Sequence, residues 1–116
     1  MRNATRGTVV AERVVLADNF VARLCGLIFR APLASGEGLL LVPCKQIHMM
    51  GMKYAIDAVF LDREGTVVGL VEAIKPGAIS SCFAGARSCL ELPAGTIAMS
   101  KTALGDRLEN LPVSAA

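Results

Sequence analysis

The sequence predicts one small, mainly β domain over residues 1–116, built as a β-sandwich or a barrel-like sheet with one or two short helices. Its length of 116 residues is that of a single domain. Short β-branched runs alternate with Gly- and Pro-containing turns, a pattern typical of sandwiches and barrels. Hydrophobic residues make up 53% of the chain, although only four Phe and one Tyr are aromatic. We therefore expect a compact aliphatic core.

The first elements are a strand and a helix. A Val-rich run over 8–16 predicts a β segment. Asp18 or Asn19 is a suitable N-cap for a short helix, and Gly26 is a suitable residue to end it.

A β-hairpin is the clearest local prediction. The β-rich runs 58–61 and 66–71 are separated by residues 62–65, and Gly65 can adopt the positive φ that a tight reversal requires. Similar signals predict, in chain order, a turn over 36–38, a strand over 39–42 closed by Pro43, a turn at Pro76-Gly77 with a loop to Gly85, and a strand over 88–92. The last predicted elements are a helix over 96–103 with Thr96 as its N-cap, a stop at Gly105 and a strand over 106–109.

Charge and hydropathy exclude several classes of function. The formal net charge is +2, and the twelve Lys and Arg residues never form a run, so a nucleic-acid partner is not predicted. No segment approaches the roughly 20 apolar residues of a membrane span. Because Glu12 and Arg13 interrupt the apolar N-terminal stretch, a secretory signal is not predicted either. We expect a soluble, cytoplasmic protein.

The cysteines at 25, 44, 82 and 89 form no Cys-x-x-Cys pair and are expected to be reduced and mostly structural.

Four motifs, in order, carry a family resemblance. They are residues 24–30 (LCGLIFR), 47–62 (IHMMGMKYAIDAVFLD), 90–95 (LELPAG) and 105–106 (GD). Together they resemble the domain-of-unknown-function family 192, an uncharacterised prokaryotic family, over a core of about 17–109. The resemblance implies a single, mainly β domain of bacteria and archaea, often found behind an export signal. It implies no activity.

One branch of that family is especially similar. Its pattern is Pro-Cys followed by Ile-His-Thr-(aromatic)-x-Met-Arg-(aromatic)-Pro-Ile-Asp, and this chain matches it at Pro43, Cys44, Ile47, His48, Met52, Ile56 and Asp57. Met49 replaces the usual Thr, Lys53 the usual Arg, and Ala55 the usual Pro. The last two changes remove a bidentate Arg contact and a rigid turn that the resemblance would otherwise imply.

A soft-metal site is one hypothesis for this stretch. If the segment is extended, Cys44, His48, Met50 and Met52 share one face, because side chains alternate along a strand. Thiol, thioether and imidazole groups suit Cu(I) or Zn(II). The alternative is that the Met side chains fill the core while His48 bonds a backbone carbonyl. The spacing matches no standard zinc pattern, so no metal and no cofactor is predicted.

Polar side chains form a second candidate set. Its members are Arg30, His48, Asp57, Asp62, Glu91 and Asp106. Strand alternation predicts that Leu90 and Leu92 face inward and that Glu91 faces outward on a solvated surface. The alternative is that Glu91 is partly buried and pairs with Arg30 or Lys53 across a groove.

The leading functional hypothesis is a non-catalytic binding module. A groove bordered by 47–57 and Glu91 would take a small ligand or a peptide, with ligand-binding residues Arg30, His48, Met52, Asp57 and Glu91. The competing hypothesis is a small enzyme that uses His48 with Asp57 or Glu91 for acid–base chemistry. An enzyme would place these groups within hydrogen-bond reach in one pocket, with His48 accessible.

Overall fold

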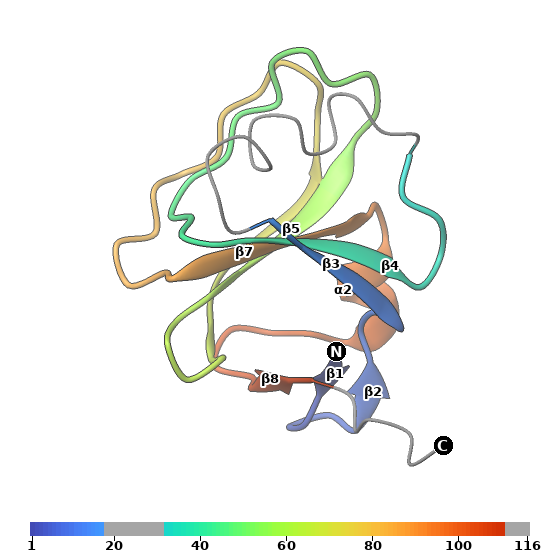
Figure 1. The fold of residues 1–116 in the computed structure, drawn as a ribbon, viewed down its shortest axis with the longest axis vertical. Coiled ribbons are helices and arrows are strands. Elements are labelled where there is room, and N and C mark those ends of the chain that lie inside the picture. The colour runs from blue at the N-terminus through green and yellow to red at the C-terminus, as the bar shows by residue number, and fades with distance from the viewer. Residues whose placement is uncertain (18–31, 111–116) are drawn as a thin grey trace.

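Two β-sheets make up the fold in the computed structural model, which describes residues 1–17 and 32–110 (Figure 1). The larger sheet has the strand order β3-β4-β7-β5-β6, and the smaller has the order β2-β1-β8. The strands are β1 (Arg2–Asn3), β2 (Thr8–Val9), β3 (Arg13–Ala17), β4 (Glu37–Leu41), β5 (Ile56–Leu61), β6 (Val67–Ile74), β7 (Ser88–Pro93) and β8 (Leu108–Glu109), and the described helix is α2 (Thr96–Ser100). The predicted mainly β fold is confirmed.

Strand β7 lies at the centre of the larger sheet. It runs antiparallel to β4 on one side and to β5 on the other, so that Leu90 lies opposite Leu40 and Val59. The outer pairs are the parallel β3–β4 and the antiparallel β5–β6 hairpin. Every backbone group of a central strand is shared with two neighbours, which makes β7 a rigid platform for its side chains.

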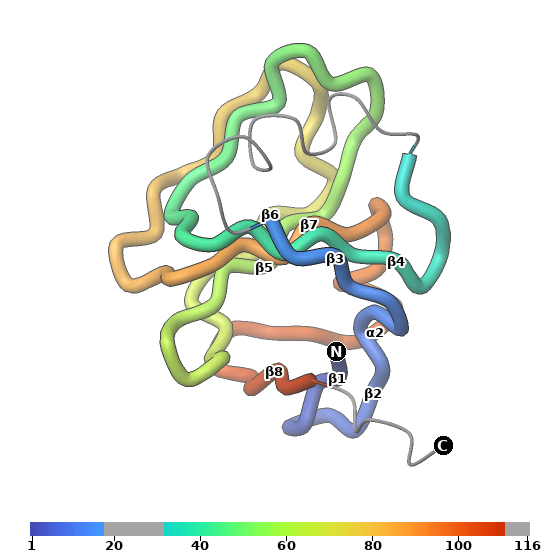
Figure 2. The backbone as a smooth tube through the Cα atoms, viewed as in Figure 1, coloured from blue at the N-terminus to red at the C-terminus, as the bar shows by residue number. Residues whose placement is uncertain are grey.

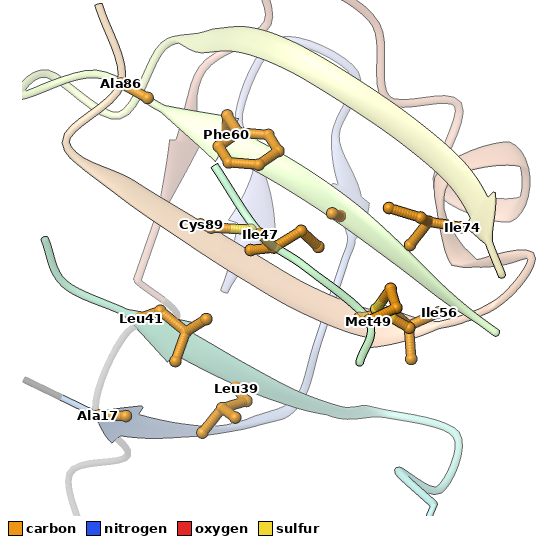
Figure 3. Close-up of a cluster of buried hydrophobic side chains, with 11 residues drawn as sticks. Ala17, Leu39, Leu41, Ile47, Met49, Ile56, Phe60, Ile74, Ala86 and Cys89 are labelled. Atoms are coloured by element: carbon orange, nitrogen blue, oxygen red, sulfur yellow. The ribbon is translucent and has the colours of Figure 1, made fainter. Parts of the chain in front are cut away.

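Both faces of this sheet are covered, as the tube in Figure 2 makes clear. On one face, residues 42–55 and 75–87 fold back over the strands, and the buried side chains there form what we call the loop-side cluster (Figure 3). Its members are Ala17, Leu39, Leu41, Ile47, Met49, Ile56, Ala58, Phe60, Ile74, Ala86 and Cys89. The opposite face packs on α2 and the smaller sheet through the helix-side cluster, which comprises Val10, Ala11, Val59, Leu61, Val67, Leu90, Leu92, Ile97 and Leu108.

The predicted hairpin is confirmed in detail. Strands β5 and β6 pair antiparallel around the reversal, where Gly65 adopts a φ of 82°. The Asp62 carboxylate accepts hydrogen bonds from the backbone N–H groups of Glu64 and Thr66, each at 2.9 Å. A short Asp in this position satisfies turn donors that would otherwise depend on water.

Other elements differ from the predictions at their ends. The 8–16 segment is two strands, because the chain passes from the smaller to the larger sheet between Val10 and Glu12. Gly38 lies inside β4 rather than in a turn. The final strand covers only Leu108–Glu109. The helix expected from Asp18 or Asn19 to Gly26 lies outside the described residues.

The helix at 96–103 is shorter than predicted and is capped differently. It ends at Ser100, where Lys101 adopts a left-handed φ of 57°. Gly95 rather than Thr96 occupies the N-cap position and offers no side-chain acceptor, while the Thr96 hydroxyl donates to the carbonyl of Pro93. The acceptor for this helix start therefore comes from elsewhere in the chain.

Substituting Gly69 by alanine tests the packing of the loop-side face. A Cβ at this position would lie 2.5 Å from two ring atoms of Phe83, whose ring packs on Phe60 at a centroid distance of 4.5 Å. We expect Gly69→Ala to lower the free energy of unfolding by about 1–3 kcal/mol, as overpacked cores do. The matched control is Gly85→Ala, whose Cβ meets no atom within 4 Å. Equal urea midpoints for the two variants would contradict this account of the packing.

Candidate functional site

The candidate site is centred on Glu91, on the loop side of the central strand. Glu91 lies opposite Leu39 of β4 and Ala58 of β5, and both neighbours belong to the loop-side cluster. Its side chain is buried, with 8% of the residue surface exposed. The alternation predicted from the sequence is correct, since Leu90 and Leu92 face the helix-side cluster. The expected solvated position of Glu91 is wrong, because the loops cover the second face of the sheet as well.

Burial, without an ion pair to any Lys or Arg in residues 1–17 and 32–110, changes the proton affinity of Glu91. Desolvation, with a smaller contribution from Cys44, raises the pKa of Glu91 from 4.5 to about 7. The ion pairs among the described residues are Arg2–Glu109, Arg6–Asp106 and Arg13–Glu12. Lys53, one predicted partner, is exposed and belongs to none of them, and Arg30, the other, lies outside the described residues. At neutral pH this carboxyl group therefore exists in both protonation states.

Two cysteines lie beside Glu91. Cys89 precedes it by two residues on β7, so both side chains face the loop side. Cys44 packs against the same cluster, and its backbone N–H donates to the carbonyl of Arg87 at 3.0 Å. The two thiols are within hydrogen-bond range of each other. Burial, this contact and the charge of Glu91 hold the pKa of Cys89 well above its usual value.

The segment after Cys44 is held over the sheet by a short ladder. The N–H of Ser80 donates to the carbonyl of Ile47 at 2.9 Å, and the N–H of Met49 donates to that of Ala78 at 2.8 Å. Between these bonds, His48 forms a β-bridge with Ile79. Ile47 and Met49 point into the loop-side cluster, so alternation directs His48 outward. His48 is exposed, as is its partner Ile79.

Asp57 faces the other side of the sheet and has a different role. It is fully buried, and its carboxylate accepts three backbone hydrogen bonds, from Ala73 at 2.8 Å, Gly95 at 3.1 Å and Ile97 at 2.9 Å. Asp57 is therefore the missing acceptor at the start of α2. The predicted pairing of His48 with Asp57 is wrong, because His48 belongs to the loop-side cover while Asp57 points toward the helix.

The two remaining carboxylates of the predicted polar set also serve separate structural sites. Asp62 holds the hairpin turn. Asp106 joins the N-terminal segment to the C-terminal one, accepting hydrogen bonds from Asn3, Arg6 and the N–H of Ala103. The contacts from Arg6 and Asn3 lower the pKa of Asp106 to about 2. The structure thus disperses these groups instead of gathering them into one cleft.

The proposed soft-metal face does not form as the spacing suggested. His48 and Met50 are exposed, whereas Cys44 and Met52 pack against the core. A turn closed by the bond from the N–H of Met52 to the carbonyl of Met49 breaks the alternation. Within residues 1–17 and 32–110, no three or more His, Cys, Asp or Glu side chains are grouped so that they could hold a metal ion.

Sequence reasoning missed Cys89 as part of the site, although Cys89 and Glu91 stand two apart on a predicted strand. It also missed an open groove of about 390 Å³ at the far end of the sheet. Hairpin residues and the region around β8 line this groove, and three of the lining side chains are Arg63, Arg87 and Arg107.

The fold and the buried carboxyl site define a small two-sheet β domain without an assembled catalytic set among its described residues. The chain belongs to the DUF192 family, described as "Uncharacterized ACR, COG1430", whose family profile matches residues 1–110. This confirms the predicted family.

Relatives and solved structures agree with that assignment. An uncharacterised UPF0127 protein of Pyrococcus furiosus is 34% identical over 112 residues, covering 94% of this chain and 96% of its own length. A solved structure of a Sinorhizobium meliloti 1021 protein, described as a proposed transcription regulator, is 30% identical with a TM-score of 0.74 and covers 83% of this chain and 79% of that one. A Novosphingobium aromaticivorans protein of unknown function has the same TM-score at 22% identity, covering 83% of this chain and 73% of that one, and shows the fold alone. No helix of the described part of the chain is long and apolar enough to cross a membrane.

Proposed function

We propose that this domain is a non-catalytic binding module that recognises an N–H donor group of a small ligand or a peptide through Glu91. The observation that carries the proposal is the buried position of this carboxyl group on the central strand. Placing an ionisable group there costs folding free energy unless a partner compensates for the lost water. Perturbed carboxyl groups in covered positions mark functional sites more often than ordinary surface charges do.

The chemistry of Glu91 specifies the ligand group. Above a pH of about 7 the carboxylate is an acceptor that favours an ammonium, a guanidinium or an amide N–H. Its side chain lies on the loop side, the face of the sheet that the segments 42–55 and 75–87 cover. Arg30, His48 and Met52 stay predicted ligand contacts, and His48 and Met52 belong to the first of these two segments.

The same geometry favours binding over acid–base catalysis. His48 points away from the sheet, and Asp57 occupies the opposite face, where backbone donors use both of its oxygens. Neither group is placed to exchange a proton with a substrate held at Glu91. We propose neither a nucleic-acid nor a membrane partner, because the basic residues are scattered along the sequence. The cytoplasmic location stays a prediction.

A thermal-shift titration tests the proposal. Small amines, guanidines, amino-acid amides and short Lys- or Arg-containing peptides are added to the protein at pH 8. A ligand at 100 times its Kd should stabilise the folded state by about 2.7 kcal/mol and raise the melting temperature accordingly. Glu91→Gln should abolish the shift, because the amide cannot act as an anionic acceptor.

The matched control is Glu64→Gln, which removes a carboxylate from the exposed hairpin turn. This variant should bind as the wild type does. A panel without any Glu91-dependent shift, or ligands that stabilise Glu91→Gln and the wild type equally, would overturn the proposal.

A further inference from the structure

The two thiols beside Glu91 form a pair rather than two isolated core residues. Cys89 lies on β7 opposite Leu41 of β4, and the chain reaches Cys44 three residues after Leu41. The hydrogen bond from the N–H of Cys44 to the carbonyl of Arg87 at 3.0 Å then turns the chain back beside β7. Cys44 consequently packs against the cluster that contains Cys89, and the two side chains are in hydrogen-bond contact.

The two cysteines differ in their access to solvent. Cys89 is completely buried, whereas Cys44 is partly exposed. A water-soluble oxidant therefore meets Cys44 first, and Cys89 is positioned to react with whatever forms there. Redox-sensitive cysteine pairs often place a solvent-accessible attacking thiol next to a resolving thiol, and Cys44 and Cys89 have this arrangement.

We propose that Cys44 and Cys89 form a reversible intramolecular disulfide when the domain meets a hydroperoxide, with Glu91 as the base that deprotonates Cys89. The thiolate of Cys44 attacks one peroxide oxygen, the O–O bond breaks, and the released hydroxide takes up the proton that Cys44 had lost. Cys44 is then a sulfenic acid. The sulfur of Cys89 attacks the sulfenic sulfur as its proton passes to Glu91. Glu91 then gives this proton to the hydroxyl group of the sulfenic acid, which leaves as water as the S–S bond forms. Two thiols are oxidised and one hydroperoxide is reduced; hydrogen peroxide gives two water molecules.

Glu91 suits this second step by position and by chemistry. It follows Cys89 by two residues on the same face of β7, and its charge acts on the Cys89 thiol. A buried thiol resists ionisation, so closing the disulfide needs a neighbouring acceptor for its proton. The inference concerns the free domain and is tested without any ligand, so it stands or falls independently of the binding function.

Peptide mapping provides the test, because trypsin separates all four cysteines. Cys25 lies in the peptide 24–30, Cys44 in 31–45, Cys82 in 64–87 and Cys89 in 88–101. The third peptide stays whole because Lys75 precedes Pro76 and is not cleaved. The purified, reduced domain is treated with hydrogen peroxide, remaining thiols are blocked with N-ethylmaleimide, and the digest is analysed by mass spectrometry. We expect the 31–45 and 88–101 peptides to appear joined, two hydrogens lighter than their sum, and to separate on reduction.

Cys82 supplies the competing outcome and the control. It is exposed, and the N–H of the next residue, Phe83, donates to the carbonyl of Lys45, so Cys82 lies near the Cys44 segment. Cys82→Ser should leave the Cys44–Cys89 cross-link unchanged, and Cys44→Ser should abolish it. A cross-link from Cys44 to Cys82 or Cys25, or irreversible oxidation of Cys44 with Cys89 still reduced, would overturn the proposal.

Dimedone, which traps sulfenic acids, tests the role of Glu91 separately. In Glu91→Gln the second step slows, so the Cys44 sulfenic acid lives longer. We expect dimedone labelling of Cys44 to increase about tenfold or more relative to the wild type. Glu64→Gln should label as the wild type does. Equal labelling of all three proteins would remove Glu91 from the mechanism.

Discussion

Replacing Asp57 with alanine is expected to lower the free energy of unfolding by about 3 kcal/mol or more. The carboxylate accepts the N–H groups of Ala73, Gly95 and Ile97 from a position without solvent exposure. Each backbone donor left without an acceptor in such a place costs about 1–3 kcal/mol. A typical domain has only 5–15 kcal/mol of net stability, so this single change should remove much of it.

The loss has a structural reason beyond the count of bonds. Ala73 has a φ of 47°, a left-handed conformation that non-glycine residues rarely adopt. The bond from its N–H to Asp57 helps to hold that conformation in β6, while the other two bonds fix the start of α2 against β5. Asp57 thus joins three segments that the sequence separates by 16 to 40 positions.

Urea unfolding at pH 7 measures the effect. Asp57→Asn keeps the shape and one acceptor oxygen, so its loss should be smaller than that of the alanine variant. The comparison variant is Asp62→Ala, which removes a carboxylate that also accepts two backbone bonds, but in a partly exposed turn where water can replace it. An Asp57→Ala domain no less stable than Asp62→Ala would contradict the role assigned to Asp57.

The contrast between these two aspartates marks what the sequence can predict. The role of Asp62 depends on residues two and four positions away, within the reversal that Gly65 and the flanking β-rich runs predict. The role of Asp57 depends on Gly95 and Ile97, which only the folded chain brings to it. The sequence predicts Asp57 as a ligand contact, and nothing local indicates that it caps a distant helix.

Glu91 shows a similar division between local and long-range information. Strand alternation correctly separated it from Leu90 and Leu92. Whether its face meets water depends on the segments 42–55 and 75–87 folding over the sheet. Nothing in the local sequence indicates that Ile47 and Met49 anchor the first of these segments to the core. The 8–16 segment differs from its prediction for the same reason, because only the tertiary fold makes the chain change sheets within it.

Raising the pH from 4.5 to 8 is expected to lower the stability of the wild-type domain by about 3 kcal/mol through Glu91 alone. In the unfolded chain this carboxyl group loses its proton near pH 4.5, whereas the folded protein retains it until about pH 7. The folded-state pKa is raised, so the stabilisation is complete at low pH and is lost as the pH rises through this window. A difference of about 2.5 between the two pKa values, at about 1.4 kcal/mol for each pKa unit, gives roughly 3–4 kcal/mol over the whole titration. About 3 kcal/mol of this falls between pH 4.5 and 8, because the unfolded chain is already half ionised at pH 4.5.

Glu91→Gln isolates this contribution, because glutamine has nearly the same shape and no charge. The variant should match the wild type at pH 4.5 and exceed its free energy of unfolding by about 3 kcal/mol at pH 8, as measured by urea denaturation. Asp106 provides an internal check, because its pKa is lowered and its effect on stability has the opposite dependence on pH. Its stabilisation is present above pH 4 and is lost as the pH falls toward about 2. This loss should be the same in the wild type and in Glu91→Gln. A wild-type domain whose stability runs parallel to that of Glu91→Gln between pH 4.5 and 8 would mean that the buried carboxylate is already compensated. In that case Glu91 would lack the uncompensated buried charge that the proposed ligand is expected to neutralise.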